Sequence, residues 1–205
     1  MKRLFIIAFL ILSSQISFSQ TDSSTNYKSY FEKQLKAWTR SYNNFQLSDF
    51  HLTDSSKFEN TPFGDIKDLK EFYRKYKPAL SFSPDSNQFI DLYSYQLNLE
   101  WKGKKLVAST EVDQAISLCN LKAKKWMRIF FRGASSAIED AVWISNTKFI
   151  LVGYEHYDDK FRPVIFIGNT LKQMLYVYKT PDENCFGKKD GYTSQKLKAL
   201  KFEEE

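Results

Sequence analysis

The sequence is short of several residue types that carry chemistry. It has two histidines, His51 and His156, and no His-x-x-x-His or Glu-x-x-His spacing, so a zinc site or a Ser-His-Asp arrangement has little material. No glycine-rich phosphate loop is present, and Ser135 in "GASSA" lacks the Gly-x-Ser-x-Gly motif of hydrolase nucleophiles. These absences disfavour the common hydrolase and nucleotide-binding classes, and we expect neither a cofactor nor a metal.

Glycine and proline are also scarce, with 7 and 5 residues in a chain of 205. Aromatic residues, in contrast, make up 17% of the chain, and hydrophobic residues make up 42%. Aromatic side chains are enriched in strands, and this apolar content suffices for one packed domain. The composition therefore predicts a mainly β domain rather than a disordered chain.

The N-terminus has the features of a targeting segment. A basic start is followed by an apolar stretch, Leu4 to Leu12, that is too short to span a bilayer, and Ser17 and Ser19 stand where signal peptidase reads the chain. We expect residues 1–19 to be a signal peptide cleaved after Ser19, with no membrane span afterwards. The "SFSQ" ending resembles signal peptides of secreted Bacteroidetes proteins, and the expected location is secreted or periplasmic.

The charge of the exported chain is mildly positive. Removal of the signal peptide leaves 28 basic and 24 acidic side chains, a net charge of +4. So small an excess, on an exported protein, does not indicate a nucleic-acid partner.

Cys119 and Cys185 would enter an oxidising compartment after export. Two cysteines allow one intramolecular disulfide, and two unpaired, buried thiols are the alternative. Both remain open at this stage, because the sequence does not show how far apart the two residues lie.

Residues 20–80 are expected to form a helical N-terminal segment. Apolar residues recur at three- and four-residue spacing from Tyr27 to Tyr42, which predicts a helix that lies against its own domain rather than on a membrane or a partner. A second helical pattern opens at Asp65, a capping residue, and ends at Pro78.

Residues 81–205 are expected to form a β-rich domain, because apolar and polar residues alternate there. Two similar series, residues 86–131 and 138–180, each predict four strands. The fold class is therefore mainly β, with two four-stranded antiparallel blade-like sheets preceded by two helices. The tail "KLKALKF" fits either a last strand or a short helix.

Matched positions support the similarity of the two series. Trp101 aligns with Trp143, and Asn120 aligns with Asn169, while extra residues stand in the second series around "HYDDKFR". A repeat of four short strands at this period is typical of propeller blades.

Two stretches resemble blades of the WD40-like or PD40-like β-propeller family. "FSPDSNQFIDLYS" is similar to the "FSPDG" opening of those blades, and "VWISNTKFILVG" is similar to a first hairpin. The resemblance covers Phe82 to Thr180. This segment lacks the Trp-Asp dipeptide of WD40 repeats. It implies an incomplete propeller or a sandwich, since a closed ring needs about four blades. It implies no particular function, because propellers host many.

The most promising polar stretch is "GYEHYDDKFR", which contains Glu155, His156, Asp158 and Asp159. A polar hairpin loop is the ordinary interpretation. A divalent-metal or acid–base site is the alternative. We select these four residues as a binding site, because an insertion in one copy of a repeat lengthens a loop that often carries function. No catalytic residue is assigned.

Aromatic side chains offer stacking surfaces for sugars or apolar ligands, although most must be buried in the core. The candidates are Tyr93, Tyr95, Trp101, Trp126, Trp143, Tyr154 and Tyr157. The sequence thus predicts a secreted or envelope-facing binding or assembly module with an unknown protein or glycan partner. The alternative is a metal-assisted or acid–base hydrolase that uses the loop from Glu155 to Asp159.

Overall fold

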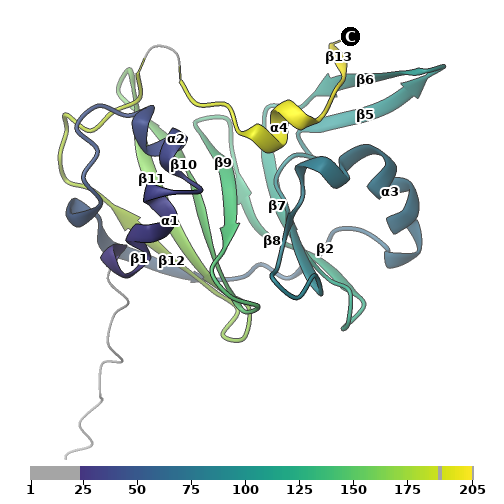
Figure 1. The fold of residues 1–205 in the computed structure, drawn as a ribbon, viewed down its shortest axis with the longest axis horizontal. Helices are drawn as coiled ribbons and strands as arrows, with labels where there is room; N and C mark the ends of the chain where they lie inside the picture. Colours follow the sequence, from purple (N-terminus) through teal and green to yellow (C-terminus); the bar gives the residue numbers. More distant parts are fainter. Residues whose placement is uncertain (1–23, 189–190, 205) are drawn as a thin grey trace, which may run out of the picture.

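The computed structural model describes residues 24–188 and 191–204 and shows a mainly β protein built from antiparallel sheets (Figure 1). Two sheets have five strands each, and a third has three. The expected signal peptide lies outside the described residues. Within those residues, no helix is long and apolar enough to cross a membrane.

The first large sheet, here the β10 sheet, carries the second predicted series. Its strands in spatial order are β1 (His51–Lys57), β12 (Met174–Lys179), β11 (Lys160–Asn169), β10 (Lys148–Tyr157) and β9 (Ser136–Trp143). The four strands expected between residues 138 and 180 are all present. Strand β1 adds a fifth, although it comes from the segment expected to be helical, and it pairs with β12.

One face of the β10 sheet is covered by the N-terminal helices, and the predicted stripe makes this contact. The expected single helix is divided into η1 (Ser24–Tyr27), α1 (Lys28–Glu32) and α2 (Lys36–Arg40). Its five apolar residues are all buried in one cluster with the sheet residues Ile150 and Ile165. They are Tyr27, Phe31, Leu35, Trp38 and Tyr42. The prediction that this face lies against its own domain is confirmed.

The second large sheet, here the β7 sheet, comes from the first predicted series. Its strands in spatial order are β2 (Thr61–Pro62), β8 (Lys125–Arg132), β7 (Gln114–Asn120), β4 (Gln88–Asp91) and β3 (Ser81–Phe82). Its outer face carries α3 (Leu69–Tyr76), which follows η3 (Ile66–Asp68). Asp65 caps this segment as predicted, since its Oδ1 accepts from the Lys67 N–H at 2.9 Å.

The two large sheets share a core between their inner faces. Phe130 of β8 packs on Phe166 of β11 with ring centroids 5.1 Å apart. The guanidinium of Arg132 lies over both rings, at 5.3 and 5.6 Å from their centroids. The molecule therefore has four layers, with α1 and α2 on the outside of one sheet and α3 on the outside of the other (Figure 1).

The third sheet, here the β5 sheet, projects from this body (Figure 1). It consists of β5 (Leu97–Lys102), β6 (Lys105–Thr110) and the short β13 (Glu203–Glu204), which runs parallel to β6. Helix α3 covers part of its edge. The Tyr76 hydroxyl donates to the Leu97 carbonyl at 2.8 Å and accepts from the Leu99 N–H at 2.9 Å. These are the bonds that a neighbouring strand would make.

The predicted layout of two equivalent four-stranded units is wrong for the first unit. Strands β5 and β6 leave the β7 sheet, so β4 pairs directly with β7. Trp101 consequently lies in the β5 sheet and is 44% exposed, whereas Trp143 lies in the β10 sheet and is 7% exposed. The two tryptophans do not occupy equivalent places.

The second hairpins of the two series do share a local feature. Asn120 ends β7 and Asn169 ends β11, and each side-chain oxygen accepts backbone N–H bonds of the following turn, from Ala123 and from Leu171. An asparagine that bonds the backbone ahead of it stabilises such a turn. A short helix, α4 (Gln195–Ala199), includes the first residues of the tail "KLKALKF".

Both cysteines are free, buried thiols. Cys119 lies on the face of the β7 sheet that α3 covers, cross-strand from Phe89 and Trp126, and Cys185 belongs to the cluster beneath α1 and α2. Burial raises the pKa of Cys119 to about 12 and, together with the charge of Asp182, that of Cys185 to about 11. Of the two possibilities left open by the sequence, the structure therefore shows two unpaired thiols and no disulfide between Cys119 and Cys185.

Candidate functional site

The acidic stretch selected from the sequence is the tip of a long hairpin rather than a loop. Strands β10 and β11 pair without interruption from Lys148–Asn169 to Tyr157–Lys160. Only Asp158 and Asp159 remain for the turn, and both are exposed. The extra residues of the second series therefore lengthen two strands instead of forming an irregular binding loop.

Glu155 connects the two large sheets. Its Oε1 accepts from the Arg132 guanidinium at 3.0 Å, and its Oε2 accepts from the Lys179 ammonium at 2.5 Å. Burial alone would raise the pKa of Glu155, but the hydrogen bonds and charges of Lys179 and Arg132 outweigh it and hold that pKa below the usual value. This carboxylate is already occupied by the protein's own cations.

His156 faces away from Glu155, because successive side chains of a strand point to opposite sides. Its exposed ring lies beside Phe161, with centroids 5.0 Å apart. The four selected residues therefore do not converge. Among residues 24–188 and 191–204, no three His, Cys, Asp or Glu side chains are grouped as metal ligands.

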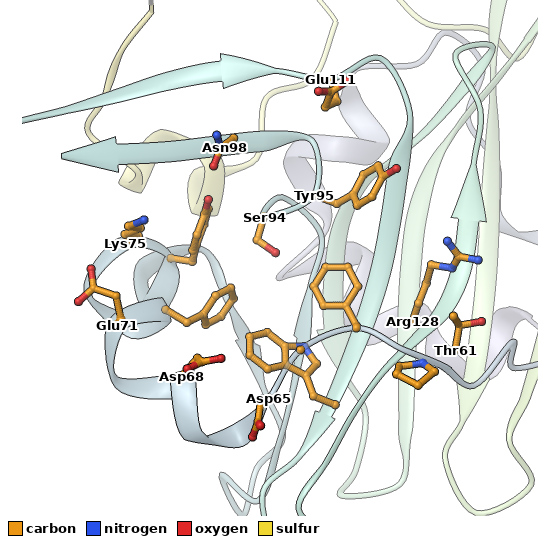
Figure 2. A pocket seen from close by; sticks show the side chains of 16 residues that line it. Thr61, Asp65, Asp68, Glu71, Lys75, Ser94, Tyr95, Asn98, Glu111 and Arg128 are labelled. Carbon is orange, nitrogen blue, oxygen red and sulfur yellow. The ribbon is translucent and has the colours of Figure 1, made fainter. Parts of the chain in front are cut away.

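An open hollow lies away from the tip of the β10–β11 hairpin, between α3, the end of the β7 sheet and the first residues of β5 (Figure 2). We call it the α3 groove, and its volume is about 890 Å³. Sixteen residues line it: Thr61, Pro62, Phe63, Gly64, Asp65, Asp68, Glu71, Phe72, Lys75, Tyr76, Ser94, Tyr95, Asn98, Glu111, Trp126 and Arg128. They come from segments that are widely separated in the sequence.

Packed aromatic rings give the groove a rigid apolar wall. Trp126 lies 4.5 Å from Phe72 and 5.8 Å from Phe63 between ring centroids, and its indole N–H donates to the Ser117 hydroxyl at 2.9 Å. Gly64 runs close over this indole, where an added Cβ would lie 2.6 Å from Cε3. Glycine is thus required at this position, since any side chain would displace the tryptophan.

Tyr95 gives the groove an exposed ring. It is 40% exposed and packs edge-on against Phe131, with centroids 5.8 Å apart. The Arg128 guanidinium lies over the same Phe131 ring at 5.0 Å. Tyr95 is therefore held from one side while much of its surface remains open to solvent.

Charged and polar groups of both signs surround these rings. Figure 2 shows Asp65, Asp68 and Glu71 along the α3 wall, with Arg128 and Thr61 on the opposite side. Several of these charges already have local partners. Glu71 pairs with Arg74 at 2.8 Å, and Arg128 pairs with Glu59 at 2.6 Å. The groove consequently offers many hydrogen-bonding groups and a small excess of acidic over basic side chains.

Sequence reasoning missed this groove as a site, although it selected two of its members. Tyr95 and Trp126 were among the aromatic candidates, but only the fold places them beside α3. Tyr93, Trp126 and Trp143 are buried at 4%, 5% and 7% exposure and offer no platform, so Trp126 supports the wall of the groove from beneath while Tyr95 is exposed.

Comparison of the chain with known proteins finds no matching family model, no matching curated protein and no matching solved structure. The resemblance to propeller blades therefore rests on the sequence motifs alone.

Proposed function

We propose that the protein is a secreted or envelope-facing module that binds a glycan chain in the α3 groove without catalysing a reaction on it. The observation that carries this proposal is the combination of aromatic rings and hydrogen-bonding groups of both kinds in one open hollow of about 890 Å³. A volume of this size accommodates a ligand of several rings.

The chemistry of the lining favours a sugar over a strongly charged ligand. A sugar ring presents apolar C–H faces that stack on aromatic rings and hydroxyl groups that both donate and accept hydrogen bonds. Tyr95 supplies an exposed ring, while Asn98 and Glu111 supply polar groups near it (Figure 2). The lining contains four acidic and two basic side chains, several with local partners, so a polyanion would meet repulsion along the α3 wall. Export, expected from residues 1–19, would bring the module to the glycans of an envelope.

Binding is favoured over hydrolysis because three of the four carboxylates of the groove stand along one wall and two of these three have structural partners. Glycoside hydrolysis uses two carboxyl groups that face each other across the scissile bond. Asp65, Asp68 and Glu71 instead stand along one wall, where Asp65 caps η3 and Glu71 pairs with Arg74 (Figure 2). The alternative hydrolase site is not supported either, since Glu155 is held by Arg132 and Lys179.

The test is affinity electrophoresis of the purified protein through gels that contain a β-glucan, a xylan or a mannan. We expect retardation by at least one of them. Y95A should weaken binding at least about fivefold, because it removes the exposed stacking ring. Y157A is the matched control, since Tyr157 is 64% exposed and stands outside the groove.

Variants D158N and D159N test the site that the sequence suggested, and we expect both to bind like the wild type. The proposal is wrong if none of the three polysaccharides retards the protein. It is also wrong if Y95A, folded normally, is retarded as strongly as the wild type.

A further inference from the structure

A second candidate site is built around Glu139, on the opposite side of the molecule from the α3 groove. Strand β9 contains a bulge against β10, because Val152 pairs with Asp140 while Gly153 pairs with Ile138. Glu139 is the additional residue. Gly153 permits the bulge, since a Cβ there would lie 1.9 Å from the Ala137 carbonyl oxygen. Bulges of this kind redirect side chains and are common beside functional sites.

The bulge turns Glu139 towards α2 and into a small pocket. The Trp38 indole N–H donates to its Oε2 at 2.8 Å, and the Tyr42 hydroxyl lies 3.1 Å from the same oxygen. Both contacts leave Oε1 available to another donor. In the ranges 24–188 and 191–204, no lysine or arginine forms an ion pair with this carboxylate. Among the described residues, its hydrogen-bond donors are therefore two neutral groups, Trp38 and Tyr42.

The pocket beside Glu139 has a volume of about 190 Å³, and its lining combines aromatic rings with the backbone near Gly187 and with Lys188. Tyr42, Tyr154, Phe161 and Tyr192 all contribute to its wall. Tyr154 and Phe161 pack edge to face, with centroids 4.8 Å apart. Drug-sized ligands occupy pockets of about 300–1,000 Å³, so this one suits a single head group.

We infer that the Glu139 pocket binds a primary alkylammonium group. The ammonium would donate to Oε1, and the rings would stabilise the cation and its alkyl stem through their faces. A neutral or anionic ligand would leave the partly buried carboxylate without a counter-charge, which is unfavourable. The site is separate from the α3 groove, so its test does not depend on glycan binding.

The acid–base state of the pocket supports this inference. Burial raises the pKa of Glu139 to about 7, against the lowering effect of its bonds from Trp38 and Tyr42. Burial and nearby carboxylates also raise the pKa values of Tyr42 and Tyr192, so both hydroxyls stay protonated and neutral. The other charged groups near Glu139 have hydrogen-bond partners of their own, although Lys188 also lines the pocket. Asp140 pairs with Lys196, and the Lys188 ammonium donates to the Arg40 carbonyl.

The experiment is an NMR titration of the exported protein with n-butylammonium, followed through the indole N–H signal of Trp38, which is identified with W38F. We expect a saturable shift of that signal at pH 8. Butan-1-ol, a neutral molecule of similar size, should produce none. Below the pKa of about 7, affinity should fall about tenfold per pH unit, because only the carboxylate attracts the cation.

Three variants distinguish binding in the Glu139 pocket from non-specific binding of the cation elsewhere on the protein. E139Q keeps an acceptor for Trp38 and should weaken binding at least tenfold. F161A removes a ring that is 47% exposed and should weaken binding severalfold. D158N removes an exposed carboxylate near the same hairpin tip and should change nothing. Equal binding of butan-1-ol, or wild-type affinity in a folded E139Q, would overturn the inference.

Discussion

Replacement of Glu155 by glutamine distinguishes a structural carboxylate from a binding one. Glu155 lies on β10 in one large sheet, and its partner Arg132 lies on β8 in the other. Glutamine has nearly the same shape but no charge, so the variant removes the ion pairs without creating a cavity. The guanidinium of Arg132 would then keep its positive charge between the sheets, where its Nε already lacks a hydrogen-bond partner.

The expected loss of stability is about 2 kcal/mol. Disruption of a fully buried ion pair costs about 3–5 kcal/mol, and disruption of an exposed one costs about 0–1 kcal/mol. The side chains of Arg132 and Glu155 are 13% and 30% exposed, and that of Lys179 is 43% exposed, so the group lies between these limits. For a domain of this size, the melting temperature should fall by about 4–8 °C.

The pH dependence has a defined sign. The pKa of Glu155 is lower in the folded protein than the value of about 4.3 in the unfolded chain. The ion pairs of Glu155 therefore stabilise the fold fully above a pH of about 4.3, and this stabilisation is lost as the pH falls through the folded-state pKa. The stability difference between wild type and E155Q should therefore be largest near neutral pH and shrink in acid.

Urea unfolding at several pH values measures this difference through the midpoint at constant slope. D158N and D159N, on the exposed turn of the same hairpin, should stay within about 0.5 kcal/mol of the wild type. Unchanged stability of E155Q at pH 7, or a difference that grows in acid, would refute the structural role.

Two further predictions concern buried groups. Y76F removes the hydroxyl that bridges Leu97 and Leu99, which should cost about 1–3 kcal/mol in urea unfolding and speed amide exchange at Leu99; wild-type exchange at Leu99 would contradict the bridge. Cys119 and Cys185 should both react with a thiol reagent in the denatured, unreduced protein and should be protected in the folded one, because they are free and buried with raised pKa values. A single reactive thiol, or none, after denaturation would contradict the unpaired state.

The sequence by itself determined the local elements of this protein. Alternation of apolar residues marked β9 to β12, and the apolar stripe from Tyr27 to Tyr42 marked the helical face that α1 and α2 bury. Asp65 marked the start of η3. Each of these signals is carried by neighbouring residues, since capping and side-chain periodicity both act within a few positions of the chain.

The tertiary structure decided how those elements combine, and it decided the sites. The same alternation fits a strand in either sheet, so nothing in the sequence of β5 and β6 showed that they would leave the β7 sheet. Pairing of β1 with β12 depends on which edge is open once the other strands have assembled. Glu155 looked like a ligand until Arg132 was brought to it from the other sheet. The α3 groove and the Glu139 pocket arose in the same way, because residues distant in the chain meet only after the sheets and helices have packed.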